Sequence, residues 1–310
     1  AIYNTGWKGS IFIVDDNFIG NKAEVRKFLP VLFDWQKKYD FPYTFFTEAS
    51  VDIALPANRD ILEGMVKSGF NMVFNGLESN DPVVLRKMNK SQNLGSINLA
   101  DKVKIIQEAG LEVTGGFIVG SDGESKQVFE NLFDFIQTSG IVIPMVGLLT
   151  ALKGTDLYNR LEAEGRLRSE STGNNTSMLG FNFRPEQDEQ FLIKGYRDFM
   201  RKLFTSENYY ARCRALDARQ GHHVQERSIN KQGFRAFASI VYKNLFEKPD
   251  KEFFRYIAEV ALTRPSQFSE AITRAVKLHH FKVMIDGESS VVQYHERAEN
   301  LYDSFSQKVA

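Results

Sequence analysis

The sequence predicts an α/β protein with a partial (β/α) barrel over residues 1–170 and an all-helical extension over residues 171–310. Three observations lead to this prediction. Short apolar strands alternate with helical patterns, a glycine precedes four of the five strands, and polar residues recur where the strands end. Strands that alternate with helices form parallel βαβ units, and right-handed crossovers leave a barrel or a doubly wound sheet.

The repeating unit consists of a helix, a glycine and a strand. It recurs in SGFNMVF (68–74), AGLEVTG (109–115) and SGIVIPM (139–145). The glycine takes the left-handed position that closes the preceding helix. The opening TGWKGSIFIV (5–14) has the same form, so we expect residues 1–5 to end a helix that begins in a longer protein. The alternative is an irregular N-terminus.

The pattern places each element in turn. The first predicted helix begins at the N-cap Asn21 with Glu24 in a capping box, and Pro30 is expected to kink it. STGNNTS (171–177) is a polar linker. The expected strands are Ile11–Asp15, Tyr43–Glu48, Asn71–Gly76, Glu112–Val119 and Val142–Leu149. The later helices are expected at 188–204, 206–219, 230–247, 250–262 and 265–284, with their aromatic faces in the core.

The composition excludes several functional classes. The 39 Lys and Arg residues balance 39 Asp and Glu residues, so the basic excess typical of nucleic-acid binders is missing. No apolar run reaches the roughly 18 residues of a transmembrane helix. Cys213 is the only cysteine, which excludes an intrachain disulfide, and we interpret it as a packing residue. A cytoplasmic location is therefore expected.

Polar groups follow four successive predicted strands. Ligands of parallel α/β proteins bind at the carboxyl ends of the strands, so this recurrence predicts a binding site. Taken singly, Asp15, Asn17 and Ser79 are explained equally well as helix caps or dipole partners. The residues at these strand ends are Asp15, Asp16, Asn17, Glu48, Glu78, Ser79, Gly120, Asp122 and Glu124.

Two kinds of ligand fit such a ring of carboxylates. Asp16, Glu48 and Glu78 could hold Mg²⁺ in a lyase or isomerase barrel. They could instead accept hydrogen bonds from the ribose and amino group of a nucleotide-like cofactor. Gly116 and Gly120 favour the second, because glycines in a strand allow close approach of a ligand. A third alternative is a non-catalytic interaction module.

Several segments together resemble one known family. They are IFIVDDNFIGN, FTEASVDIA, GFNMVFNGLES, KSQN, GLEVTGGFIVGSD and LLTALKGTDLYNRLEAEGRL. In this order they resemble the cobalamin-binding radical S-adenosylmethionine (SAM) proteins, in the branch that contains the hopanoid C-2 methylases. The resemblance covers about residues 5–220 and includes TGNNTSMLGFNFRP and GYRDFMRKLFTSENYYARC. It implies strands two to six of a (β/α)6 barrel.

The resemblance also implies cofactor contacts for SAM. The family's adenine-contacting strand carries a GxIxG motif, often with Glu three residues later; that position is Gly123 here, so a direct role for Glu124 is in doubt. Gly154-Thr155 matches a structural turn. The implied SAM-binding positions are Asp15, Asp16 and Asn17 at the amino-acid end, Glu48, Glu78 and Ser79 at the ribose or amino group, and Gly116, Ile118, Gly120, Leu148 and Leu149 at the adenine.

The implied chemistry depends on three cofactors. In this family a [4Fe–4S] cluster reduces SAM, a 5′-deoxyadenosyl radical abstracts hydrogen from an unactivated carbon, and methylcobalamin can supply a methyl group. The cluster loop CxxxCxxC and the cobalamin domain are not in this chain, so both cofactors are expected only in the full-length protein, and this chain alone is expected to be inactive. The implied substrate is lipid-like or polycyclic, and self-association through the exposed first strand is expected.

Two histidine pairs do not predict a metal site. Neighbouring residues on a helix point in different directions, so His222-His223 and His279-His280 would coordinate one ion poorly. His279 shares a stripe with Phe268, Ile272, Val276 and Val283, and we predict that it is buried in the helical core.

Overall fold

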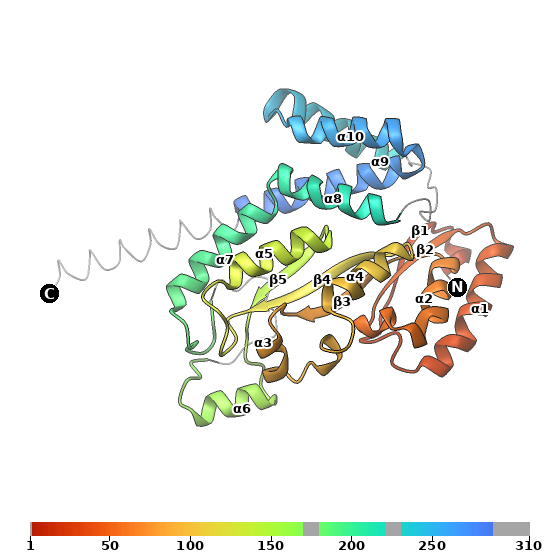
Figure 1. Cartoon of the computed structure of the whole chain (residues 1–310). Coiled ribbons are helices and arrows are strands. Elements are labelled where there is room, and N and C mark those ends of the chain that lie inside the picture. The colour runs from red at the N-terminus through yellow and green to blue at the C-terminus, as the bar shows by residue number, and fades with distance from the viewer. Residues whose placement is uncertain (1, 170–179, 221–230, 288–310) are drawn as a thin grey trace. The chain divides into compact units, whose positions relative to one another are not determined.

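Five parallel strands form one sheet whose strand order, β1-β2-β3-β4-β5, follows the chain (Figure 1). The computed structural model describes residues 2–169, 180–220 and 231–287. The predicted partial barrel is confirmed; β2 and β4 have the predicted bounds, whereas β1 lies two residues earlier and ends before Asp15. The strands are β1 (Gly9–Ile13), β2 (Tyr43–Glu48), β3 (Phe70–Glu78), β4 (Glu112–Val119) and β5 (Pro144–Leu148).

The connections between the strands are helical. Because the strand order is sequential, right-handed crossovers place the connecting helices on the same face of the sheet. The helices are α1 (Lys22–Lys38), α2 (Arg59–Lys67), α3 (Pro82–Lys87), α4 (Leu99–Glu108) and α5 (Val128–Ser139). Short 3₁₀ turns complete the connections at Ile2–Thr5, Val51–Ala54, Pro56–Asn58 and Ser91–Asn93.

The predicted N-cap and glycine stops are confirmed, whereas the capping box is incomplete, because the Glu24 carboxylate pairs with Lys27 and not with the Asn21 N–H. Asn21 caps α1, its Oδ1 accepting from the Glu24 N–H at 3.3 Å. The Glu24 carboxylate bonds to Lys27 at 2.8 Å. Gly140 closes α5 in the left-handed conformation with φ 64°. The corresponding glycines of the other units also have positive φ: Gly6 76°, Gly69 96° and Gly110 114°.

The two faces of the sheet differ in burial. On the face toward the helices, Val73, Leu77 and Val113 are inaccessible to solvent. The opposite face is only partly covered at Phe46 and Phe74 and exposed at Phe12. The rings of Phe12 and Phe46 stack with centroids 4.8 Å apart. The sheet therefore has one packed face and one open face that carries aromatic side chains to the carboxyl edge.

The helices after β5 divide between two compact units. These helices are α6 (Asp156–Ala163), α7 (Glu189–Leu203) and α8 (Ser206–Gln220). The first unit contains the described residues of 1–199 and 211–225, and the second those of 200–210 and 226–310. In the first unit Tyr196 of α7 donates to the Val146 carbonyl at 3.0 Å. Arg219 of α8 donates to the Thr138 carbonyl at 2.7 Å. The predicted boundary after residue 170 stays a prediction.

The second unit is helical, as predicted. Its core is aromatic, with the rings of Tyr210 and Tyr256 stacked at 4.9 Å and those of Phe204 and Phe281 at 4.5 Å. It contains α9 (Lys231–Tyr242), a π-helical turn (Lys243–Glu247), α10 (Lys251–Thr263), a 3₁₀ turn (Pro265–Gln267) and a helix at 268–287. The predicted helix over 230–247 is thus interrupted at residue 243.

Two predictions about single residues have different outcomes. Cys213 is buried, as expected of a packing residue. His279 is only half-buried and lies 3.1 Å from Lys243 Nζ, so the prediction of full burial was wrong. Burial and then the Lys243 charge lower the pKa of His279. His222-His223 and the whole of STGNNTS lie outside the described residues. None of the described helices is long and apolar enough to cross a membrane.

Candidate functional site

The carboxyl edge of the sheet carries the predicted site residues. Because all five strands are parallel, the residues at their carboxyl ends lie along the same edge, as strand polarity predicted. Asp16 follows β1, Glu48 ends β2, Glu78 ends β3, Gly120 follows β4 and Leu149 follows β5. Their role as cofactor ligands stays a prediction.

Three of the predicted site residues hold loops at this edge. Asp15, which lies beyond the end of β1, accepts from the Asn17 N–H at 2.9 Å. Asn17 Oδ1 accepts from the Ser50 N–H at 2.9 Å and joins this loop to the end of β2. Ser79 Oγ accepts from the Asp81 N–H at 3.0 Å. These side chains therefore have structural roles in loops, but they are not the helix caps that the sequence suggested, because Asn21, Ser50 and Asp81 cap the helical elements that follow.

Glu48 and Glu78 have different surroundings. Within the described residues, the half-buried Glu48 carboxylate has neither a hydrogen bond nor an ion pair. The Glu78 carboxylate is 14% exposed and pairs with Lys90 at 2.7 Å. Glu78 also has φ 62° and follows a register shift between β3 and β4. A bulge redirects a side chain, and non-glycine residues in this conformation are strained, as is common at functional sites.

The segment KSQN supports the end of β3, a role that the sequence did not reveal. Asn93 Nδ2 donates to the carbonyls of Gly76 and Leu77 at 3.1 and 2.8 Å. Lys102 is only 1% exposed and donates to the Gln92 carbonyl at 2.6 Å. These contacts fix the segment that follows Lys90, and they help to position this partner of Glu78. The only sign of this role in the sequence was that KSQN is a polar run within a loop.

The glycines of β4 are covered by aromatic rings of this chain. A Cβ on Gly116 would lie 2.7 Å from Cζ of Phe74. A Cβ on Gly120 would overlap the ring of Phe181. Asn182 holds this segment by accepting from the Ala151 N–H at 2.9 Å and donating to the Ala151 carbonyl at 2.8 Å. Close packing against these rings is therefore one reason for glycine at both positions. The close approach of a ligand stays a prediction.

Glu124 is connected to this edge through Gly120. Its Oε2 accepts from the Gly120 N–H at 2.8 Å, and the residue is 8% exposed. Burial raises the pKa of Glu124 to about 7; hydrogen bonds from the backbone of Gly120 and Ser121 oppose this shift, and the charge of Asp81 adds to it. The sequence left Glu124 without a direct role, because only the fold brings its carboxylate back to Gly120.

The carboxylates of the edge do not form a metal site. Among the residues that the structure describes, no group of three or more His, Cys, Asp or Glu side chains is placed to hold a metal ion. Asp16, Glu48 and Glu78 follow successive strands but do not converge. The ammonium of Lys90 already neutralises Glu78. The Mg²⁺ alternative is therefore not supported by the geometry.

Comparison with curated proteins identifies relatives. The chain is 35% identical over 202 residues to the hopanoid C-2 methylase of Rhodopseudomonas palustris, covering 65% of this chain and 37% of that protein. This chain is homologous to the hopanoid C-2 methylase. The predicted resemblance to this branch is confirmed. An uncharacterized methyltransferase of Synechocystis sp. is 31% identical over 284 residues, covering 90% of this chain and 52% of the relative. This homologue of the methylase thus spans about half the length of the relatives that it matches.

A family model and solved structures also match this chain. The model of a domain of unknown function (DUF4070) matches residues 155–291. The radical SAM methyltransferase TsrM of Kitasatospora setae is 12% identical with TM-score 0.45, covering 87% of this chain and 52% of TsrM. The cobalamin-dependent SAM radical enzyme OxsB is 11% identical with TM-score 0.45, covering 94% and 49%. At these values the structural matches say nothing about function.

Proposed function

We propose that this chain provides the SAM-binding part of a cobalamin-dependent radical SAM enzyme, which methylates an unactivated carbon of a lipid-like or polycyclic substrate. The observation that carries the proposal is the 35% identity over 202 residues to a hopanoid C-2 methylase. A bacteriochlorophyllide d C-8(2)-methyltransferase of Chlorobaculum tepidum is also related, at 26% identity over 162 residues. The named substrates of both relatives are polycyclic. A cytoplasmic location remains part of the proposal.

The residues at the carboxyl edge fit SAM chemically. The cofactor presents hydroxyl and ammonium donors, and carboxylates accept strongly from both. Glu48 offers an unpartnered carboxylate among the described residues, and Glu78 offers one that Lys90 holds in place. Ile118 and Leu149 are half-buried apolar side chains at the ends of β4 and β5, suited to the adenine face. Asp16, which follows β1, is exposed, and it stands at the position implied to bind the amino-acid end of SAM.

The residues of this chain do not fit an iron–sulfur cluster. Such a cluster in this family needs three thiolates, and the single cysteine, Cys213, is fully buried within α8. We therefore assign the cluster and the cobalamin to other parts of the full-length protein. The role of this chain is to bind and orient SAM at the sheet edge.

Labelled SAM tests the proposal in the full-length protein. The anaerobically reconstituted enzyme is incubated with candidate polycyclic lipids and SAM that carries a deuterated methyl group. We expect a product heavier by one labelled methyl group, together with 5′-deoxyadenosine, both detected by mass spectrometry. A full-length protein that carries its cluster but binds no SAM in calorimetry would refute the proposal.

A further inference from the structure

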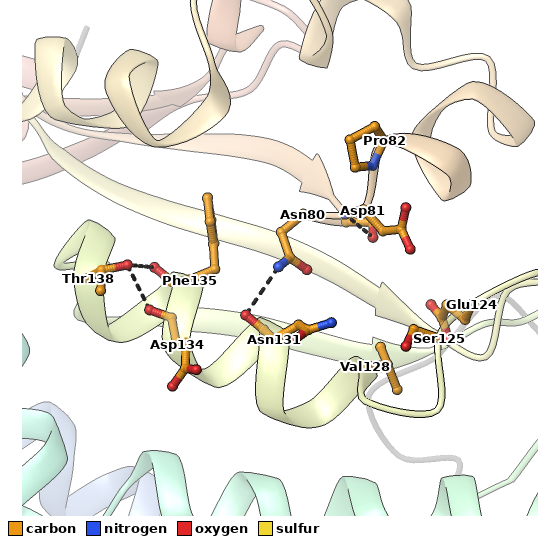
Figure 2. Close-up of a pocket in the computed structure, with 11 residues that line it drawn as sticks. Asn80, Asp81, Pro82, Glu124, Ser125, Val128, Asn131, Asp134, Phe135 and Thr138 are labelled. Carbon is orange, nitrogen blue, oxygen red and sulfur yellow. Dashed lines mark hydrogen bonds between the residues drawn. The ribbon is translucent and has the colours of Figure 1, made fainter.

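A cavity lies between the loop after β3 and helix α5 (Figure 2). Its volume is about 420 Å³. Asp81 and Glu124 lie at the same end of the cavity, where the two loops face each other. The lining side chains are those of Ser79, Asn80, Asp81, Pro82, Glu124, Ser125, Val128, Asn131, Asp134, Phe135 and Thr138.

The polar lining of this cavity lacks a positive charge. It includes three carboxylates, from Asp81, Glu124 and Asp134, and no lysine, arginine or histidine. The charge of Asp81 adds to the raised pKa of Glu124, which shows that the two carboxylates interact unfavourably when both are ionised. Like charges held together in this way are relieved by a cation between them.

Glu124 gives a second, independent indication of a ligand. The residue is more than nine-tenths buried and lines the cavity. Its Oε2 is occupied by the Gly120 N–H, whereas Oε1 is buried without a hydrogen-bond partner in the described part of the chain. Buried carboxylate oxygens are normally hydrogen-bonded, because an unpaired one loses its hydration without compensation. When Glu124 is ionised, Oε1 therefore needs a donor, and the described part of the chain supplies none.

The chemistry of the walls narrows the class of donor. Among the described residues no group of three or more His, Cys, Asp or Glu side chains is placed to hold a metal ion, which favours an organic cation here. Pro82, Val128 and Phe135 add apolar surface next to the carboxylates. A ligand that fits both the carboxylates and the apolar surface has an ammonium group on a short aliphatic chain. We propose that this cavity binds a small primary alkylammonium ion, whose N–H groups donate to Glu124 Oε1 and Asp81 and whose alkyl chain contacts these three side chains.

The proposal is independent of SAM binding at the open face. The cavity adjoins the proposed SAM site at Ser79, which lines the cavity, and through the hydrogen bond from Gly120 N–H to Glu124 Oε2. An occupied cavity would hold Glu124 ionised, and an ionised carboxylate accepts more strongly from the Gly120 N–H. The ligand would thus stabilise the loop after β4 as a secondary effect.

Titration of the complete 310-residue chain with n-butylammonium tests the proposal, with 1-butanol as the neutral isostere. Binding is measured by calorimetry and by ligand-observed NMR at constant ionic strength. We expect saturable binding of the ammonium and at least tenfold weaker binding of the alcohol, since a charge-assisted hydrogen bond is at stake. Equal affinity for both probes, or no saturable binding of either, would overturn the proposal.

Matched variants locate the binding. Glu124→Gln should weaken n-butylammonium binding about tenfold or more. Glu130→Gln removes the same charge from an exposed position of α5 outside the cavity and should leave binding unchanged. Asp81→Asn keeps the cap of α3, because Asn caps as well as Asp, and should also weaken binding. If Glu124→Gln fails to fold, Asp81→Asn decides alone: unchanged affinity would overturn the assignment.

Discussion

Glu48 and Glu78 occupy equivalent positions at the ends of neighbouring strands but differ in electrostatic state. Lys90 pairs with Glu78, whereas the Glu48 carboxylate has no ion pair within the described chain. An unpaired carboxylate is available for a cationic or hydroxyl donor at once, and a paired one must share its oxygens with the existing ammonium. The two glutamates should therefore respond differently to substitution.

In the full-length enzyme, Glu48→Gln and Glu78→Gln should each lower the affinity for SAM about tenfold to a hundredfold. The reason is the loss of a charge-assisted hydrogen bond worth about 1.5–3 kcal/mol. Glu78→Gln should also destabilise the fold slightly, because Lys90 loses its partner, whereas Glu48→Gln should not. Calorimetry with SAM and thermal melts on the same samples measure both effects. Unchanged affinity for SAM in both variants would show that neither glutamate binds the cofactor.

Glu124 should make the stability of the chain depend on pH. Burial raises its pKa to about 7 from 4.5, so its contribution is fully present below about pH 4.5 and is lost as the pH rises through 7. The loss is up to roughly 3 kcal/mol at 1.36 kcal/mol per pKa unit. Glu124→Gln removes this dependence.

Urea unfolding of the wild-type chain and of Glu124→Gln between pH 5 and pH 8 measures the effect. We expect the difference in free energy of unfolding to shift in favour of the variant as the pH rises. Glu130→Gln, at an exposed position of α5, is the control for a solvated carboxylate. Parallel profiles for wild type and Glu124→Gln would contradict a raised pKa.

At this scale the sequence predicted which residues lie at the edge but not what they touch. Strand polarity placed Glu48, Glu78 and Gly120 correctly, because an edge position depends only on strand direction. The partners Lys90, Asn93 and Phe181 come from loops whose paths no periodicity determines. Glu124 was missed for the same reason, since its hydrogen bond to Gly120 depends on the turn between them.

Elements of the sheet were predictable because local signals coincide there. Short apolar runs gave the bounds of β2 and β4 correctly, and for β4 the stop at Gly110 marks the end of the preceding helix. β1 was misplaced because Val14 continues the apolar run although it is 82% exposed beyond the strand. The π-helical turn at Lys243–Glu247 was invisible in the sequence, since its residues continue the helical pattern.

Strand β4 should tolerate alanine poorly at Gly116, and β5 should tolerate it well at Gly147. A Cβ on Gly116 meets the Phe74 ring at 2.7 Å, whereas a Cβ on Gly147 meets no atom within 4 Å. These two glycines lie on paired strands two positions apart in register, and neither has positive φ. We expect Gly116→Ala to cost about 1–3 kcal/mol through overpacking and Gly147→Ala to be neutral or stabilising by up to about 1 kcal/mol.

Urea midpoints of the two alanine variants provide the measurement. Adding Phe74→Leu to Gly116→Ala should recover part of the loss, because it removes the ring that the new methyl group meets. Equal stability of Gly116→Ala and wild type would show that the Phe74 ring moves aside freely. The packing explanation of this glycine would then be wrong.

For the whole molecule, the cysteine count gives a prediction about cofactors. The chain alone should retain no iron–sulfur cluster after anaerobic reconstitution, because one buried thiol cannot replace three thiolate ligands. Absorbance in the thiolate-to-iron region and iron analysis of the desalted chain measure the outcome. A stoichiometric [4Fe–4S] signal that survives Cys213→Ala would contradict the assignment of the cluster to other parts of the protein.

The edge of the sheet at β1 gives the last prediction. β1 pairs only with β2, so its other side presents backbone donors and acceptors without a strand partner in the described sheet. Phe12 and Val14 add exposed apolar surface at this edge. Unprotected edge strands pair with other chains. We therefore expect the chain to self-associate through β1 as its concentration rises.

Light scattering and sedimentation of the wild-type chain over a wide concentration range measure this association. Val14→Lys places a charge next to the edge and should shift the equilibrium toward monomer, as lysines on natural edge strands do. Val31→Lys makes the same change on α1, where Val31 is 67% exposed, and should leave association unchanged. A strict monomer at high concentration would refute the prediction. Association weakened equally by both variants would instead place the contact away from β1.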